Sequence, residues 1–329
     1  LASGDKNIDL ISVNDEMISE FKHKGYLEPL EKNVMTEEVR DSFPQKYLES
    51  ICEENGHIYS VPFQMDIMMF WVNQELLKQA GLDEIKNTGD FDILQKSLKN
   101  PDQYAYGDAW ENTHVYNSLS QFVNFWGGDY FDWTDPKTKD AARYMKSMLD
   151  EKNTSPAQFV DQYEQMEEKF IRGKYGCVFM YTSALGTFLD ADVYGKNKIH
   201  MAPLPVLHKK KATNIATWQY VLNNASENKD AAVRFLQYAA GYEGSTEYAK
   251  IMKSYPARVD VIENEDIDLE GIDMIRKYLR EYTLNARPLC ENSMGAVSDM
   301  GKLFQGYVLG QCEEDSFFEQ AQNCINTYY

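Results

Sequence analysis

Side chains that commonly carry out catalysis are present in this sequence, but their spacing matches no known catalytic arrangement. The five histidines are His23, His57, His114, His200 and His208, and no two are four residues apart. The motifs G-x-S-x-G, H-E-x-x-H and G-x-x-x-x-G-K-S/T are absent, as is a G-x-G-x-x-G between a strand and a helix. Acidic residues are too numerous to single out a glycosidase pair, which is defined by distance in space. We therefore interpret the histidines as surface or hydrogen-bonded polar residues and predict that the protein is not an enzyme.

The cysteines have neither the C-x-x-C spacing nor the Cys/His spacing of a metal site. They are Cys52, Cys177, Cys290, Cys312 and Cys324. Because their number is odd, at least one thiol is unpaired. Cys312 and Cys324 fall on the last two expected helices, where they could be bridged or both buried. We interpret the five as small buried side chains and predict no metal and no cofactor.

The elements that must position any functional residue alternate between strand and helix. Apolar periodicity predicts strands over 8–13, 66–73, 175–181 and 213–222, with extended segments over 58–62 and 201–205. It predicts helices over 15–24, 74–80, 91–98, 115–125, 136–150, 166–171, 230–240, 242–253, 267–282, 293–309 and 316–328. Ser226, and Thr182 or Ser183, are expected to cap helices that follow them. This order indicates an α/β fold.

Length and charge limit the class of protein. The 329 residues exceed one ordinary core and suit two domains of roughly 150 residues. No linker separates the domains in sequence, so we expect the chain to cross between them more than once. No apolar run approaches the ~20 residues of a membrane span. The net charge of −19 disfavours nucleic acid and could mildly favour cationic ligands; the basic run at 208–211 is interpreted as a solvated loop.

Two segments carry a resemblance to a known family. Residues 56–66 read GHIYSVPFQMD and residues 71–82 read WVNQELLKQAGL. They resemble the "G-x-x-Y-x-x-P" turn, the acidic residue four after the proline, and the "Y-N-x-x-x-x-x-x-x-G-L" segment of the extracellular solute-binding proteins that include the maltose-binding proteins. Val72 stands where the family has tyrosine. Further segments resemble family motifs in the same order, at 3–11, 25–30, 170–176, 218–236, 255–258 and around Gly306 and Gly310.

The resemblance implies a two-lobed periplasmic-binding-protein-like fold of type II, with a mixed sheet and flanking helices in each lobe. We expect one lobe from 1–64 and 216–278 and the other from 65–215 and 279–329. The family's first strands have no counterpart before residue 9, and we expect this numbering to omit them. The implied protein is a monomeric, non-catalytic receptor of an ABC importer, with permease subunits as partners. It would lie outside the cell, lipid-anchored at the cytoplasmic membrane or periplasmic.

The implied ligand is a sugar or oligosaccharide held in a cleft between the lobes. An aromatic face stacks on the apolar C–H face of a sugar while carboxylates, amides and arginine bond its hydroxyls. Asp66 aligns with the family's acidic ligand residue and is the first candidate. Trp218 and Tyr220 begin a strand, and Trp110 stands before Glu111 and Asn112 in a polar loop, which favours an exposed side chain over a core one.

The remaining candidates lie at ends of elements. Asn14 and Asp15 are expected to cap the first helix and to contact ligand. Tyr181 and Ser183 lie where a strand becomes a helix, so exposed amides there could meet ligand oxygens. Arg258 is either a ligand contact or a salt bridge between the lobes. Two alternatives stay open: the same fold binding a peptide, polyamine or other cationic solute, and a secreted enzyme acting on carbohydrate.

Overall fold

The chain returns more than once to each of two units in the computed structural model, which describes residues 1 and 3–329. Unit 1 comprises Leu1–Ile67, Ile215–Arg280 and Asn285–Ser293, and unit 2 comprises Met68–Asn214, Glu281–Leu284 and Met294–Tyr329. The expected lobes differ from these units mainly at 285–293. We assigned that segment to the second lobe, but it packs with unit 1.

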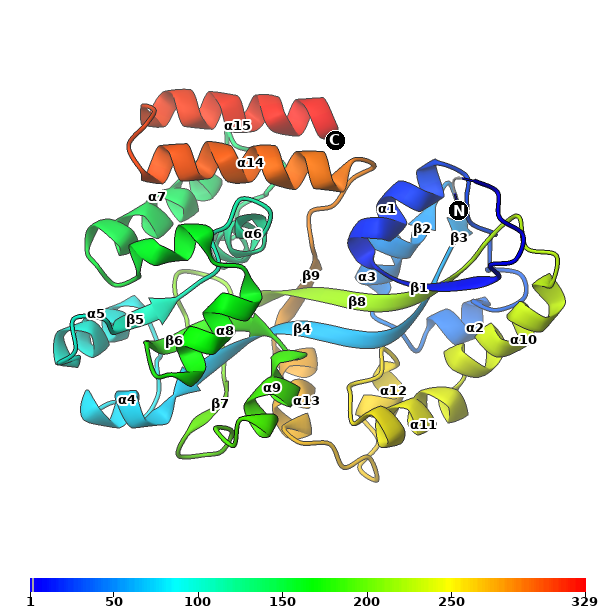
Figure 1. Cartoon of the computed structure of the whole chain (residues 1–329), viewed down its shortest axis with the longest axis horizontal. Helices are drawn as coiled ribbons and strands as arrows, with labels where there is room; N and C mark the ends of the chain where they lie inside the picture. Colours follow the sequence, from blue (N-terminus) through cyan, green and yellow to red (C-terminus); the bar gives the residue numbers. More distant parts are fainter. Residues whose placement is uncertain (2) are drawn as a thin grey trace. The chain divides into compact units, whose positions relative to one another are not determined.

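Unit 1 is built on three antiparallel strands in which β8 (Ala212–Leu222) lies between β1 (Leu10–Asn14) and β4 (Val61–Asn73). Helix α1 (Asp15–His23) lies on one side of this sheet, and α10 (Lys229–Ala240) and α11 (Tyr242–Met252) on the other (Figure 1). On the α1 side, Val13 and Val221 pack with Ile18 and Leu27. On β8, Trp218 and Tyr220 are less buried than their neighbours Thr217, Gln219 and Val221, as expected of a sheet whose two faces are covered differently.

Unit 2 contains the second half of β4, which pairs with β6 (Tyr175–Tyr181) and β7 (Ile199–Ala202). The parallel neighbour of β6 is β5 (Tyr104–Gly107). All seven residues of β6 are buried, because helices cover both of its faces, and such a strand is apolar throughout instead of alternating. This is why residues 66–73 and 175–181 were recognisable as strands from apolar runs alone.

Most expected helices are present with small shifts at their ends. The other helices of unit 1 are α2 (Glu37–Arg40), α3 (Gln45–Tyr47), η1 (Leu48–Cys52), α12 (Val259–Ile262) and α13 (Ile272–Glu281). Those of unit 2 are α4 (Gln74–Gln79), α5 (Thr88–Ser97), α6 (Val115–Trp126), α7 (Pro136–Asp150), η2 (Pro156–Val160), α8 (Tyr163–Ile171), α9 (Ala184–Asp190), α14 (Ser293–Val308) and α15 (Glu314–Tyr328).

Several short elements and one cap differ from the sequence prediction. The strand β5, the hairpin of β2 (Glu53–Glu54) and β3 (His57–Ile58), and β9 (Thr283–Ala286) were not predicted, because such short runs have no measurable period. Ser226 is not the N-cap of α10; Asn228 is. The Ser226 hydroxyl instead accepts from the Asn228 backbone amide and donates to Asp9, and so fixes the turn before the helix.

No disulfide links any of the five cysteines, so the bridge left open between Cys312 and Cys324 does not form; Cys324 is buried and Cys312 half-buried. Among the described residues, no cluster of three or more His, Cys, Asp or Glu side chains could hold a metal ion. No helix in the same part of the chain combines the length and apolar character of a membrane span.

Candidate functional site

Trp218 stands out on the β8 face of unit 1 that is opposite α1. It is 42 % exposed, whereas Trp71, Trp110, Trp126 and Trp133 are at most 6 % exposed. Its register partners are Asn14 on β1 and Gln64 on β4, and Asp66 pairs with Ala216 one step along the same face. Since paired residues of an antiparallel ladder point to the same side, an exposed indole is flanked by two amides and lies near a carboxylate. Three predicted residues, Asp66, Trp218 and Asn14, are thus brought together.

A bulge in β4 shapes this face further. The register shifts between Pro62 and Gln64, and as a result both Phe63 and Gln64 lie on the Trp218 side. Gln64 accepts a hydrogen bond from the Tyr248 hydroxyl at 2.8 Å. Burial raises the pKa of Tyr248, and the nearby carboxylate of Asp66 adds to that rise. Asp66 itself is buried, so its carboxyl group lies within the sheet and not on open surface.

Asn14 has the capping role expected of it. Its side-chain oxygen accepts from the Met17 backbone amide at 3.2 Å, and its amide donates to Glu16 at 2.9 Å. Asp15 does not face solvent as a capping residue would. It is fully buried and bonded to Arg287, which also donates to Glu16 at 2.8 Å. Asp15 is therefore held by an internal partner, and Asn14 is the member of the pair that faces the strand of Trp218.

Tyr220 lies two residues beyond Trp218 on the same face. Its ring stacks on Phe63 at a centroid distance of 4.1 Å and meets the edge of Phe235 at 5.4 Å. Burial raises the pKa of its hydroxyl. The ring is half-buried among these partners, so Tyr220 continues the aromatic surface of Trp218 but is not itself an open platform.

A second group of predicted residues lies within unit 2, at the end of β6. The Tyr181 hydroxyl donates to Asn117 at 2.9 Å, and the ring meets Tyr163 edge to face at 5.8 Å. Tyr163 in turn meets the His114 ring at 5.2 Å, and His114 lies 3.2 Å from Glu111. Tyr181 and Asn117 are buried, whereas Tyr163 and His114 are half-buried, so the accessible part of this group consists of the latter two rings.

Ser183 is exposed at the N-cap position of α9, but its side chain makes no capping hydrogen bond. That helix has seven residues, so its amides have only a weak combined dipole. The expectation that its amides meet ligand oxygens stays a prediction.

Two predicted residues are accounted for by packing within one unit. Trp110 is fully buried and meets Phe159 at 5.6 Å and Phe304 at 5.4 Å, edge to face. The interpretation of Trp110 as a residue outside the core is wrong, because segments remote in sequence cover its polar loop. Hydrogen bonds from the Ser118 and Tyr106 hydroxyls partly offset the rise that burial causes in the pKa of Asp108.

Arg258 is likewise an internal residue of unit 1. It is 8 % exposed and donates to Asp260 at 3.0 and 2.6 Å, to the Ala240 carbonyl at 2.8 Å and to Ser42 at 2.7 Å. The expected salt bridge between lobes is wrong, since Asp260 is two residues away in the same unit. Because its guanidinium group donates to these internal partners, the structure does not support Arg258 as a ligand contact.

Several residues of these two groups were missed. Gln64 follows Phe63 within the recognised turn, and its polarity in an otherwise apolar strand was an unused signal. His114 was set aside as a surface or hydrogen-bonded residue, and Tyr163 gave no local signal. Arg287 lies 272 positions from Asp15, so no spacing rule could have paired them.

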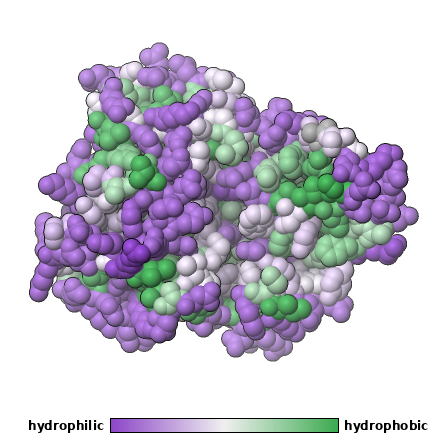
Figure 2. Space-filling view, in the orientation of Figure 1, coloured by the Kyte–Doolittle hydropathy of each residue, from purple (hydrophilic) through white to green (hydrophobic). Residues whose placement is uncertain are grey.

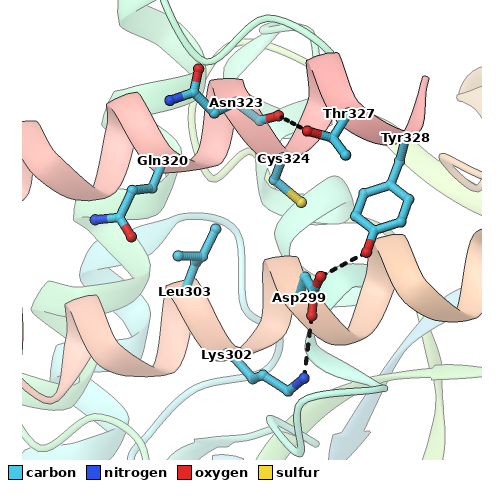
Figure 3. A pocket seen from close by; sticks show the side chains of 8 residues that line it. All are labelled: Asp299, Lys302, Leu303, Gln320, Asn323, Cys324, Thr327 and Tyr328. Atoms are coloured by element: carbon cyan, nitrogen blue, oxygen red, sulfur yellow. Dashed lines mark hydrogen bonds and ion pairs between the residues drawn. The ribbon is translucent and has the colours of Figure 1, made fainter.

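A further groove lies between α14 and α15 of unit 2, with a volume of about 460 Å³ (Figure 3). Tyr328 donates to Asp299 at 2.7 Å, and Lys302 donates to the same carboxylate at 3.2 Å. Leu303 and Cys324 contribute apolar surface. The charged groups of this groove satisfy one another, and it holds none of the sequence-predicted residues, so we place the candidate site on the Trp218 face.

Comparison with known proteins identifies relatives. The family model described as "Bacterial extracellular solute-binding protein" matches residues 1–246. The probable amino-acid ABC transporter periplasmic-binding protein y4oP of Sinorhizobium fredii is 24 % identical over 69 % of this chain. The arabinooligosaccharide-binding protein of Bacillus subtilis is 22 % identical over 81 %. The matched regions span only 54 % and 64 % of those two relatives.

Solved structures share the fold. A solute-binding protein of Thermotoga lettingae bound to alpha-D-tagatose has a TM-score of 0.83 at 18 % identity, covering 97 % of this chain and 84 % of that one. A maltose-bound protein of T. maritima has a TM-score of 0.81 at 17 % identity, covering 99 % and 86 %. The predicted two-lobed α/β fold class and the family resemblance are thereby confirmed.

Proposed function

Because the chain belongs to the bacterial extracellular solute-binding proteins, we propose that it is the non-catalytic receptor of an ABC importer and that its solute is a sugar or an oligosaccharide. Relatives whose names or structures include arabinooligosaccharide, tagatose and maltose support a saccharide. The proposed partners are the permease subunits of that importer. The proposed location is outside the cytoplasmic membrane, periplasmic or lipid-anchored, and the proposed state is a monomer that binds no nucleic acid.

The observation that carries the saccharide is the exposed indole of Trp218 between Asn14 and Gln64. A flat aromatic ring covers the C–H face of a sugar, and amides and the carboxylate of Asp66 bond its hydroxyls at the edge of that ring.

The group around Tyr181, Tyr163 and His114 in unit 2 is proposed as further ligand-binding surface, since it offers rings and polar groups of the same kind. A receptor of this class responds to ligand by a shift in its population of conformations. The expectation from the resemblance that one solute contacts both halves stays a prediction.

A second candidate solute is an amino acid, peptide or polyamine. The name of the Sinorhizobium relative and the net charge of −19 favour it, because an acidic protein attracts cations. On the Trp218 face, Asp66 would then pair with an ammonium group in place of a hydroxyl.

The test is a thermal-shift and calorimetric screen of the whole chain against arabinose, glucose, their oligosaccharides, amino acids and polyamines. We expect stabilisation by one saccharide class through mass action and, with it, protection of Trp218 from acrylamide quenching. The variant Trp218→Ala should lose both saccharide binding and the tryptophan fluorescence that acrylamide quenches. Stabilisation by amino acids or polyamines alone would transfer the proposal to the second candidate, and conversion of a saccharide to product would show an enzyme.

A further inference from the structure

Unit 1 contains an aromatic cavity of about 270 Å³ that adjoins the Trp218 face and shares Phe63, Tyr220 and Tyr248 with it. Strands β4 and β8 contribute Phe63 and Tyr220 to its wall, and helices α10 and α11 contribute Phe235, Tyr238, Tyr248 and Ile251. We call this volume, lined by β4, β8, α10 and α11, the aromatic cavity. Separately, Figure 2 shows apolar surface among the hydrophilic surface over the part of unit 1 that carries β1 and α10.

The aromatic cavity is continuous with the Trp218 face. Tyr220 follows Trp218 by two residues on one strand, so their side chains point to the same side about 7 Å apart. The Tyr248 hydroxyl donates to Gln64 at 2.8 Å, and Gln64 is the register partner of Trp218. A ring bound on Trp218 therefore lies within one ring length of the cavity wall.

The chemistry of the cavity suits an apolar group and not a second sugar ring. The Tyr248 hydroxyl already donates to Gln64, and the Ser245 hydroxyl donates to the Ala239 carbonyl at 3.3 Å. The Glu247 carboxylate lies 3.8 Å from the Lys250 ammonium group. A sugar in the cavity would leave several of its own hydroxyls without hydrogen-bond partners, which costs free energy. Burial of an apolar ring has no such cost, because it only removes apolar surface from water.

The edge of the cavity also lacks a cover of its own. Ile251 is 72 % exposed and Met252 is 61 % exposed, although both line the cavity. A ligand group seated against them removes this apolar surface from water. The volume is slightly below the roughly 300 Å³ at which pockets begin to hold drug-sized ligands, so it suits one ring and not a chain.

We propose that the aromatic cavity binds the aromatic aglycone of a glycoside whose sugar ring stacks on Trp218. The proposal rests on the saccharide receptor proposed above and names its substrate class as aryl glycosides. The sugar supplies the hydrogen bonds at Asn14, Gln64 and Asp66, and the aglycone supplies apolar contact with Phe235 and Ile251.

The experiment compares methyl and phenyl glycosides of each sugar in the screen by calorimetry on the whole chain. With wild-type protein, the phenyl glycoside should bind at least about tenfold more tightly, a factor that corresponds to about 1.4 kcal/mol. Ile251→Ser and Phe235→Ser should each reduce this ratio and together bring it near one, with the affinity for the methyl glycoside unchanged. Val160→Ser, at a residue of unit 2 that is 77 % exposed, is the matched control and should leave the ratio unchanged.

The outcomes separate the two proposals. Equal affinities for methyl and phenyl glycosides, or a ratio that survives both cavity substitutions, would overturn the aglycone site and leave the saccharide receptor intact. If Val160→Ser reduces the preference for the phenyl glycoside equally, that preference comes from general surface hydrophobicity, and the aglycone site is overturned as well. Failure to bind any saccharide would overturn the proposal that the solute is a saccharide and, with it, the aglycone site. Because Ile251 is on the surface, its variant is expected to fold even if Phe235→Ser does not.

Discussion

Arg287 and Asp15 form an ion pair that is almost closed to solvent, with their side chains 8 % and 0 % exposed. The guanidinium Nε lies 3.1 Å from Asp15 Oδ2, and a second nitrogen lies 2.8 Å from Glu16. Burial lowers the pKa of Arg287 to about 9, which leaves it charged at neutral pH. Arg287 belongs to the unit 1 segment Asn285–Ser293. In sequence, this segment lies between two segments of unit 2. The pair therefore fixes this returning segment to the first turn of α1, beside Asn14.

Removal of this pair should destabilise the protein strongly. Arg287→Met leaves the Asp15 carboxylate buried without its partner, and we expect the free energy of unfolding to fall by about 3–5 kcal/mol. Urea unfolding followed by circular dichroism measures it. Arg143→Met is the matched control, because Arg143 pairs with Glu314 and Asp140 on the surface and should cost less than about 1 kcal/mol. Similar losses in the two variants would contradict the assigned role of burial.

Trp110 and Trp218 should respond oppositely to truncation. Trp110→Ala removes a core ring between Phe159 and Phe304 and should cost about 3–5 kcal/mol of stability. Trp218→Ala removes an exposed ring and should cost less than about 1 kcal/mol while abolishing saccharide binding. Urea unfolding and calorimetry measure the two effects. A large stability loss for Trp218→Ala would show that the indole packs more than its exposure indicates.

Asp66 should affect binding more than stability. Asp66→Asn keeps the shape of the side chain but removes its charge, and it should weaken saccharide binding by about 1–3 kcal/mol, since a charged acceptor is replaced at a buried position. Calorimetry with the saccharide found in the screen measures the loss. Asp192→Asn, at an exposed carboxylate, serves as the control. If both variants bind like the wild type, Asp66 does not belong to the site.

Stability should fall as the pH drops through the range in which histidine titrates, and His200 should account for part of this. Burial lowers the pKa of His200 below its usual 6.5, although a backbone hydrogen bond partly opposes the change. Its Nδ1 is buried without a hydrogen-bond partner among the described residues. The unfolded chain takes up the proton first as pH falls, so the stability that the neutral ring contributes is present above about pH 6.5 and is lost below it.

His200→Gln should reduce the slope of unfolding free energy between about pH 7.5 and pH 5, measured by urea unfolding at several pH values. An unchanged slope in His200→Gln would mean that the imidazole is protonated in the folded protein without cost.

Much of this protein follows from local sequence. The buried strand β6 and the helix α7 were predicted with their observed ends, because a continuous apolar run and a proline at the first helical position are local signals. The strand positions of Asp66 and Trp218, and the capping role of Asn14, needed only period two and cap chemistry. The order of motifs then indicated the family.

Tertiary structure alone decided which of these residues face solvent. Trp110 and Trp218 each stand beside polar residues in sequence, yet Phe304 on a distant helix packs on the first, whereas the second stays 42 % exposed. Arg258 was expected to contact ligand or to bridge the lobes, and Asp15 to cap a helix or contact ligand; they are held by Asp260 and Arg287 instead. Periodicity reports which way a side chain points along its own element. What covers that side chain depends on segments that may be hundreds of residues away, and only the packed fold brings them into contact.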